Sequence, residues 1–269
     1  MPSSTFWQQK TFLLVTGASQ GIGQFLSVAF SKLLGAQSTV VIVARSVNGL
    51  EETKKRILAA NPAVNVVIHQ SDLSKPNPAE YATLLNSVDT DVSLSLVVHN
   101  AGSLGDCSKL VVDIKDPVEW NSYMALNLYH VTALTSEFLN KFADSKCKKV
   151  FVNITSLAAI EPLKSLGFYC IGKASREMYF RVLAAENSEL RILNYSPGPI
   201  DTDMVATLLD KINAEDVRSS FQGMRESGAL VKLEDSAEKL ISVLGKDAYK
   251  SGQRIDYFDD LAKFVEEHK

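Results

Sequence analysis

The sequence is poor in the residues that build disulfide frameworks and metal centres. Its 269 residues include three cysteines and four histidines, namely Cys107, Cys147, Cys170, His69, His99, His130 and His268. The cysteines are odd in number and widely spaced, which fits neither a disulfide framework nor a zinc ribbon. The histidines lack metal-ligand spacing, so we expect no metal site. Cys170 has no histidine near it in sequence, and we interpret it as a buried thiol rather than a nucleophile.

Basic charge and long apolar runs are also lacking. The net charge is -3 and the pI is about 5.9, so the sequence has no basic footprint for nucleic acid. Residues 1–10 lack the pattern of a signal peptide, and no apolar run approaches the roughly 18 residues of a membrane span. We therefore expect a soluble, cytoplasmic protein with neither nucleic acid nor membrane as a partner. Its length is usual for one α/β domain, and we expect residues 1–269 to form one.

The chain alternates between short apolar runs and segments of helical periodicity. Strands are predicted over residues 11–16, 39–44, 65–70, 94–98, 149–153, 190–195 and 254–258. Helices are predicted up to residue 34 and over residues 51–60, 79–88, 117–142, 168–186 and 236–244, with an amphipathic tail at 259–268. This order predicts an α/β fold, with a doubly wound, mainly parallel sheet and helices on both faces. Residues 197–228 are looser and polar, and long connections at this edge are often lids, so we expect a substrate loop there.

A glycine-rich turn separates the first strand from the first helix. Gly17, Gly21 and Gly23 allow a tight turn and let backbone N–H groups approach a pyrophosphate. The alternative is an ordinary strand-to-helix connection. Its position in the chain favours dinucleotide binding and a Rossmann-type domain.

The ends of the second and third strands carry residues that bear on the choice of cofactor. An acid after the second strand would bond the ribose 2′-hydroxyl of NAD, whereas Arg45 can meet the 2′-phosphate of NADP. Arg45 and Ser46 therefore favour NADP(H), with a solvated surface charge as the alternative reading of Arg45. Asp72 follows the third strand. Its carboxylate could accept a hydrogen bond from the adenine amino group or from backbone N–H groups of a local turn, and the spacing alone does not decide between these two roles.

Small residues follow the fourth strand, at the edge where cofactors sit in such sheets. They are Asn100, Ala101 and Gly102, whose plain alternative is a close turn. Asp116 and Pro117 mark the start of the next helix, as a cap and a first-turn proline. Asn127 lies inside that helix, although asparagine is a poor helix former.

Three groups around the fifth strand have the chemistry of a proton-transfer site. Ser156 follows that strand, and Tyr169 and Lys173 are four residues apart on one face of the next helix. An ammonium beside a phenol favours the phenolate, so we expect Lys173 to lower the pKa of Tyr169 and make it a general acid. The alternative is an ordinary Tyr and Lys on a surface helix.

In this order the motifs resemble the short-chain dehydrogenase/reductase superfamily over nearly the whole chain. The matching residues are Thr16-Gly17-Ala18-Ser19, Asn100-Ala101-Gly102, Ser156, Tyr169, Lys173 and Pro197-Gly198. The resemblance implies an NADP-dependent oxidoreductase with Ser156, Tyr169, Lys173 and Asn127 as its catalytic residues, Asn127 holding a relay water. It implies an NADP(H) site formed by Gly17, Ser19, Gln20, Gly21, Ile22, Gly23, Arg45, Ser46, Asp72, Leu73, Asn100, Ala101, Gly102, Tyr169, Lys173, Pro197, Ile200, Thr202 and Met204.

Residues 153–157, 194–204 and 251–259 resemble the sepiapterin reductase family in particular. The resemblance implies NADPH-dependent reduction of a pterin side-chain carbonyl, the final step of tetrahydrobiopterin biosynthesis, with Asp256 in segment 251–260 anchoring the pterin ring. A carboxylate can accept two parallel bonds from a pterin's amino group and ring N–H. The alternative for Asp256 is a turn or surface acid. The implied substrate site comprises Ser156, Leu157, Tyr169, Gly198 and Asp256.

Two residues depart from the pattern, and two other functions stay open. Gln20 stands where many NADP-preferring relatives carry Arg, and His99 replaces an Asn often found before the Asn-Ala-Gly motif. One alternative function is a short-chain carbonyl reductase for a non-pterin ketone or diketone; the other is a dinucleotide-binding regulator without turnover. The resemblance also implies a homodimer formed through the helices at 117–142 and 168–186.

Overall fold

The computed structural model describes residues 6–260, which form one seven-stranded sheet. Every neighbouring pair of strands is parallel, which confirms the predicted parallel sheet, and the strand order is β3-β2-β1-β4-β5-β6-β7. The strands are β1 Thr11–Thr16, β2 Thr39–Ala44, β3 Asn65–Gln70, β4 Leu94–His99, β5 Lys148–Ile154, β6 Arg191–Ser196 and β7 Gln253–Asp256. Because all run the same way, their carboxyl ends share one edge, where sites form in such folds.

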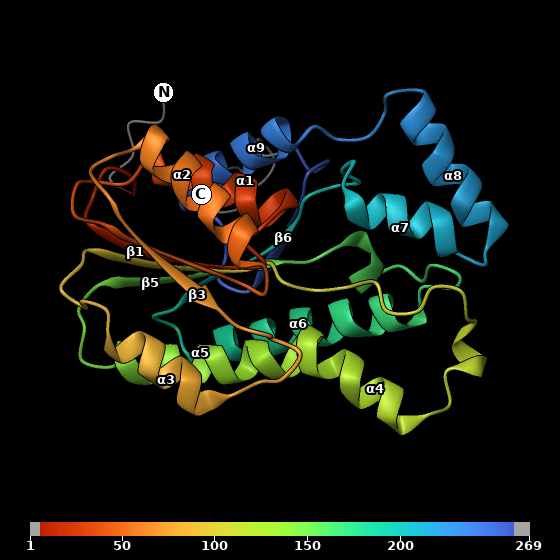
Figure 1. The fold of residues 1–269 in the computed structure, drawn as a ribbon, viewed down its shortest axis with the longest axis horizontal. Coiled ribbons are helices and arrows are strands. Elements are labelled where there is room, and N and C mark those ends of the chain that lie inside the picture. The colour runs from red at the N-terminus through yellow and green to blue at the C-terminus, as the bar shows by residue number, and fades with distance from the viewer. Residues whose placement is uncertain (1–5, 261–269) are drawn as a thin grey trace.

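Helices cover both faces of the sheet (Figure 1). One face carries α1 Gly21–Ser31, α2 Val47–Ala60 and α9 Leu233–Lys246, and the other carries α3 Pro78–Asn86, α4 Pro117–Met124, α5 His130–Lys141 and α6 Gly167–Glu186. Alternate strand residues point to opposite faces. Leu13 and Val15 therefore join the apolar core under α1, while Phe12 and Leu14 join the core under α5.

The helix predicted over residues 117–142 is interrupted, which corrects the sequence-based prediction. A π-helical segment, η2 Ala125–Tyr129, separates α4 from α5. Asn127 lies in it, and its side-chain Nδ2 donates to the Tyr123 carbonyl over 2.9 Å. In an α-helix the backbone N–H of Asn127 would donate to the Tyr123 carbonyl. The wider π turn lacks that backbone bond, and the Asn127 side chain supplies one in its place.

Residues 197–228 are mostly helical rather than a loop, a second correction. They contain α7 Asp203–Lys211 and α8 Glu215–Glu226, which project to one side of the sheet (Figure 1). Leu208 and Ile212 are buried in a small cluster with Leu104 and Leu166. The sequence analysis missed helices α7 and α8 because each has only a narrow stripe of apolar residues, and no residue of α8 is fully buried.

Most other boundaries lie within a few residues of the prediction. Helix α2 begins four residues early, at Val47, because the Ser46 hydroxyl accepts a capping bond from the Gly49 N–H (3.2 Å). Two short 3₁₀ helices, η1 Val111–Asp113 and η3 Leu157–Ala159, were not predicted. Most of the predicted tail at 259–268 lies outside the described residues.

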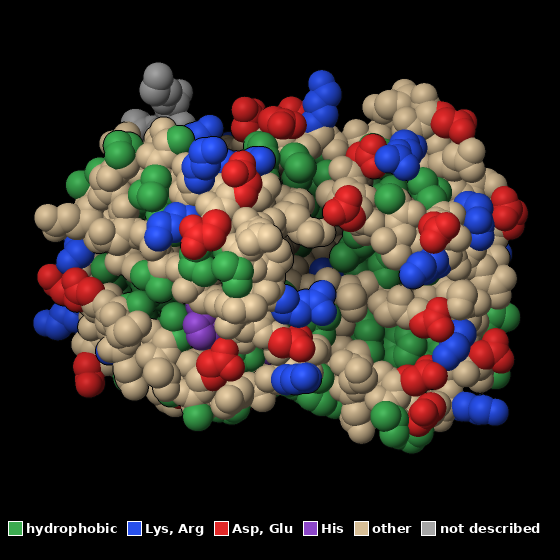
Figure 2. All heavy atoms as spheres, viewed as in Figure 1, with side chains coloured by type: hydrophobic (Ala, Val, Ile, Leu, Met, Phe, Trp, Pro, Cys, Tyr) green, Lys and Arg blue, Asp and Glu red, His purple; other side chains and the backbone are tan. Residues whose placement is uncertain are grey.

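The surface carries acidic and basic side chains interspersed, and the face in view has no basic patch (Figure 2). Between residues 6 and 260, no helix combines the length and the apolar character needed to cross a bilayer. Within the same range, no three His, Cys, Asp or Glu side chains gather as a metal site would require.

Candidate active site

A cavity of about 810 Å³ opens at the carboxyl edge of the sheet. It is lined by the predicted residues Gly17, Ser19, Gln20, Gly21, Ile22, Arg45, Ser46, Leu73, Asn100, Ala101, Gly102, Thr202 and Met204. The lining also includes Ala44, Ser71, Leu126, Asp201, Asp203 and Leu233, which sequence reasoning did not assign. Four of these six stand within two residues of a predicted lining position, so proximity in sequence was the available signal.

The glycines of the first turn are required by its geometry. Gly17 has a φ of 69°, and a Cβ there would lie 2.8 Å from the Asn100 side-chain nitrogen. A Cβ at Gly23 would lie 2.3 Å from the Gly17 carbonyl oxygen. Gly21, with a φ of 55°, opens α1, whose first turn faces the cavity without a side-chain cap at Gln20. Bare backbone N–H groups at a helix start suit the pyrophosphate of a dinucleotide.

Asn100 joins this turn to the end of β4. Its Nδ2 donates to the carbonyls of Thr16 (3.0 Å) and Gly17 (3.3 Å), while the Thr16 hydroxyl accepts from the N–H groups of Asn100 and Ala101. The Asn-Ala-Gly motif therefore makes a close turn and also forms a wall of the cavity.

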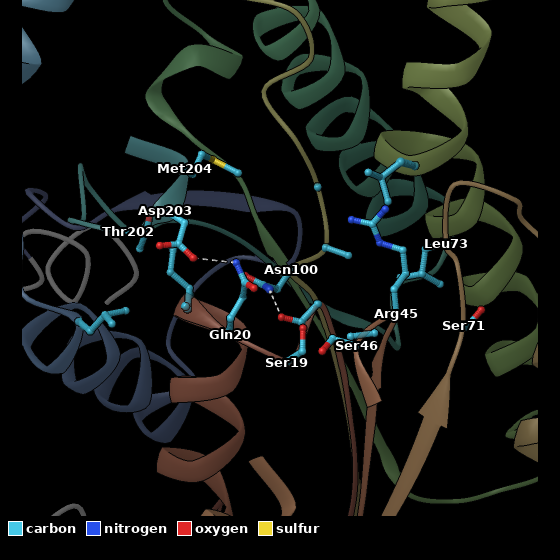
Figure 3. A pocket seen from close by; sticks show the side chains of 18 of the residues that line it. Ser19, Gln20, Arg45, Ser46, Ser71, Leu73, Asn100, Thr202, Asp203 and Met204 are labelled. Carbon is cyan, nitrogen blue, oxygen red and sulfur yellow. Dashed lines mark hydrogen bonds between the residues drawn. The ribbon is translucent and has the colours of Figure 1, made fainter. Parts of the chain in front are cut away.

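Arg45 and Leu73 lie on one side of the cavity, and Thr202, Asp203 and Met204 lie on the other (Figure 3). Arg45 is exposed, and none of the described residues hydrogen bonds its guanidinium, which leaves it available to an anionic ligand. Between the two sides, Gln20 Nε2 donates to Asp203 Oδ2 over 3.1 Å (Figure 3). That bond links the glycine-rich turn to the first turn of α7.

Asp72 acts as a turn residue in the structure. Its Oδ1 accepts from both the N–H (3.2 Å) and the hydroxyl (2.7 Å) of Ser74, which lower its pKa. Asp72 does not line the cavity, although its neighbours Ser71 and Leu73 do. The adenine-binding reading of Asp72 gains no support from this geometry.

Ser156, Tyr169 and Lys173 come together beside the end of β5. Ser156 is near enough to the Tyr169 phenol to act against the rise of its pKa, and Lys173 Nζ lies 5.5 Å from the centre of the Tyr169 ring. Lys173 is buried and donates to the Ile154 carbonyl over 2.7 Å. Helix α6 and strand β5 therefore present the three groups at one point.

The predicted effect of Lys173 on Tyr169 is corrected. Burial raises the pKa of the Tyr169 phenol, and Ser156 only partly opposes this. Burial also holds the pKa of Lys173 well below its usual value. Desolvation disfavours every buried charge, and the sequence pattern could not reveal how deep the pair lies. The site thus holds a protonated phenol, which suits a proton donor.

Asn127 is buried against the Gly102 turn. Its Oδ1 accepts from the Ser103 N–H over 2.9 Å, so the π segment reaches the wall of the cavity. A Cβ at Gly102 would come within 3.0 Å of that same oxygen.

The remaining predicted residues lie at or just after the ends of β5, β6 and β7. Pro197 and Ile200 line a small second cavity beside the first. Gly198 has a φ of 78°, and a Cβ there would lie 2.7 Å from the Val231 side chain. Leu157 is exposed on η3. Asp256 Oδ1 accepts from the Phe258 N–H (3.1 Å), while Oδ2 lies 3.5 Å from the Arg254 guanidinium.

A buried polar layer beneath the site was missed by the sequence analysis. Arg176 and Glu177 project from α6 toward the sheet, where Glu177 accepts from Thr155 and from Arg254, each over 2.7 Å. Their spacing of three and four residues from Lys173 was the available signal, because it places them near its face of the helix.

The family model described as short chain dehydrogenase matches residues 11–213. This chain belongs to the short-chain dehydrogenase family. Membership confirms the predicted superfamily and its class of activity, an oxidoreductase acting between hydroxyl and carbonyl groups. A sepiapterin reductase of Meriones unguiculatus is 39% identical over 253 residues, which cover 92% of this chain and 96% of that protein. A benzil reductase of Bacillus cereus is 27% identical over 91% of this chain and 99% of its own.

Solved structures share the fold. A short-chain dehydrogenase of Escherichia coli complexed with NADPH superposes with a TM-score of 0.75 at 23% identity, covering 94% of this chain and 98% of that one. The glycine conformations, the bare start of α1 and the unpaired Arg45 guanidinium fit a phosphate-bearing dinucleotide.

Proposed function

We propose that this chain reduces a ketone on a pterin side chain with NADPH, the activity of a sepiapterin reductase. The identity of 39% to such an enzyme carries the proposal, because it extends over 92% of this chain and 96% of that protein. The relative that acts on benzil is 27% identical over a similar share of the chain.

NADP(H) is the proposed cofactor, and when bound it supplies the hydride. The exposed Arg45 is placed beside the cavity to pair with the 2′-phosphate, while Gly17 and Gly21 give the pyrophosphate access to backbone N–H groups. The Escherichia coli structure of the same fold holds NADPH, which supports this choice.

Proton delivery is assigned to the residues at the end of β5. Tyr169 would donate its proton to the developing alkoxide, and burial keeps the phenol protonated until then. Ser156 would donate a hydrogen bond to the same oxygen. Lys173, held at the Ile154 carbonyl, would bind the nicotinamide ribose, and Asn127 would hold a water that resupplies the proton.

Asp256 is the proposed anchor of the pterin ring, and Gly198 lets the substrate pass close to backbone. The two Asp256 oxygens differ in their surroundings, since Oδ1 caps a turn and Oδ2 faces Arg254. A pterin's amino group and ring N–H match a carboxylate with two parallel bonds. To bind the pterin with both oxygens, Asp256 would have to give up hydrogen bonds of the turn, such as the one that Oδ1 accepts from the Phe258 N–H.

Assembly as a homodimer in the cytoplasm belongs to the same proposal. Exposed apolar side chains lie along α4, η2 and α6: Val118, Tyr129, Ile171, Met178 and Val182. Burying such residues against a second copy would remove apolar surface from water. Sedimentation should give twice the mass of one chain, and a single-chain mass would refute the dimer.

A reductase of non-pterin diketones is the second candidate, favoured by the benzil-reducing relative. The test compares NADPH oxidation with sepiapterin and with benzil for the wild type, Asp256→Ala and a matched control, Asp144→Ala. Asp144 is exposed before the amino end of β5, away from the site. Loss of sepiapterin turnover in Asp256→Ala alone, with benzil reduction spared, supports the pterin function. Benzil reduction without sepiapterin turnover by the wild type establishes the second candidate instead.

A further inference from the structure

A row of polar residues crosses the sheet near its carboxyl edge. His99, Asn153, Asn194 and Arg254 are register partners on β4, β5, β6 and β7. Side chains in one such row point to the same face, here the face covered by α6. Asn153 Nδ2 donates to Asn194 Oδ1 (2.9 Å), and Asn194 Nδ2 donates to the Gly252 carbonyl (3.1 Å). Hydrogen bonds therefore follow the row from β5 through β6 to Gly252, the residue before β7.

Arg176 connects α6 to this row. It is 1% exposed, and each of its three nitrogen atoms donates one bond, to the carbonyl oxygens of His99 (2.6 Å) and Ala101 (2.7 Å) and to Asn153 Oδ1 (3.1 Å). No ion pair among residues 6–260 includes Arg176. A buried cation without a carboxylate is costly, and an apolar side chain of similar volume is often more stable in its place. Stability alone therefore does not account for this arginine.

The two backbone acceptors flank Asn100. Asn100 in turn bonds the Thr16 and Gly17 carbonyls, so the contacts run unbroken from α6 through Arg176 to the glycine-rich turn. Helix α6 also carries Lys173, about one turn before Arg176, and Tyr169, about two turns before it. We propose that Arg176 is a positioning residue that fixes residues 100–102, one wall of the cofactor cavity, relative to the helix that bears the proton donor.

The charge of Arg176 also reaches the proton donor. It lowers the pKa of both Tyr169 and Lys173, in each case as a smaller effect than burial. Cys170 raises the pKa of Tyr169, Glu177 raises that of Lys173, and Tyr123 on α4 faces Tyr169 as a neutral phenol. Arg176 is the cation common to both groups, so its removal shifts both pKa values upward.

Two variants separate position from charge. Arg176→Met keeps most of the volume and removes both the bonds and the charge, whereas Arg176→Lys keeps the charge with fewer bonds. Arg56→Met is the control, since Arg56 is an exposed arginine on α2 whose one ion pair within residues 6–260 is with Glu52. The readouts are the NADPH dissociation constant without carbonyl substrate and the pH profile of kcat/KM.

For Arg176→Met we expect the NADPH dissociation constant to rise about 10-fold or more, with the alkaline limb of the profile at higher pH. For Arg176→Lys we expect weaker NADPH binding, with the alkaline limb of the pH profile of kcat/KM at the same pH as in the wild type. A purely structural role would lower the urea midpoint of Arg176→Met and leave both readouts at wild-type values, which would overturn the proposal. Should Arg176→Met not fold, wild-type NADPH affinity in Arg176→Lys overturns it equally.

The positioning role rests on the proposed catalytic roles of Tyr169 and Lys173 but not on the pterin substrate. NADPH binding needs no carbonyl compound, and benzil can replace sepiapterin in the pH profile. The Arg176 experiment can therefore be interpreted even if the protein does not reduce sepiapterin.

Discussion

The ion pair between Arg254 and Glu177 yields a quantitative stability prediction. Arg254 Nη1 lies 2.7 Å from Glu177 Oε2, and the two side chains are only 16% and 6% exposed. In Arg254→Met the Glu177 carboxylate would keep a single bond, from Thr155. Stranding a buried charge in this way costs about 3 to 5 kcal/mol, and the residual exposure of Arg254 places the loss near about 3 kcal/mol.

A matched surface pair sets the scale. Arg56 and Glu52 are also 2.7 Å apart, but their side chains are 54% and 46% exposed. Arg56→Met should therefore lower the free energy of unfolding by less than about 1 kcal/mol. The two ion pairs have the same N···O distance but different burial, so a difference between the two losses of stability would come from desolvation.

The assay is urea unfolding at fixed protein concentration, with thermal unfolding as a second probe. Arg254→Met should lose about 3 kcal/mol, equivalent to roughly 6 to 12 °C in Tm for a chain of this size. Adding Glu177→Gln should restore part of the loss, because it removes the stranded charge. A loss below about 1 kcal/mol in Arg254→Met, equal to that of Arg56→Met, would refute the reasoning.

Three further predictions concern single groups. Tyr169→Phe should lower kcat about 100-fold or more with NADPH affinity unchanged, because only the transferred proton is lost; wild-type turnover would contradict the assigned role. Arg45→Ala should weaken NADPH binding about 10- to 100-fold and leave NADH binding unaltered, as titrations with both cofactors would reveal. Burial raises the pKa of Tyr81 to about 12. Stability conferred by this neutral phenol is therefore full below pH 10 and falls by about 2 to 3 kcal/mol as the pH rises through 12. Tyr81→Phe should remove that loss in unfolding measured at pH 9 and pH 11.5, and an undiminished loss would exclude Tyr81 as its source.

The sheet was predictable because most of its strands are buried. Residues 11–16 and 94–98, for example, are fully buried and largely apolar, so the positions of the strands along the chain emerged directly. Short caps were harder to predict. The Ser46 hydroxyl, rather than any apolar periodicity, sets the start of α2.

Departures from regular periodicity escaped prediction. No sequence pattern distinguishes the π-helical segment Ala125–Tyr129 from an α-helix. Asn127 identifies it only when the hydrogen bond to the Tyr123 carbonyl is known. Helix α8 escaped because its contacts with the molecule are slight. In the π segment the tertiary environment, not local propensity, decides the structure.

The cavity was predicted well and the chemistry of its proton donor less so. Motif spacing identified Gly17, Arg45 and Asn100 as lining residues. It could not reveal that burial raises the pKa of Tyr169, since desolvation depends on how α6 packs on the sheet. For the same reason the sequence did not distinguish Arg176 from a surface arginine.

The transfer of deuterium from NADPH labelled at both C4 positions tests the central claim most directly. The protein would be incubated with this cofactor and sepiapterin, and the product analysed by mass spectrometry and NMR. We expect one deuterium on the side-chain carbon that carried the ketone. Deuterium on the pterin ring, or oxidation of NADPH without deuterium in the pterin, would contradict the account.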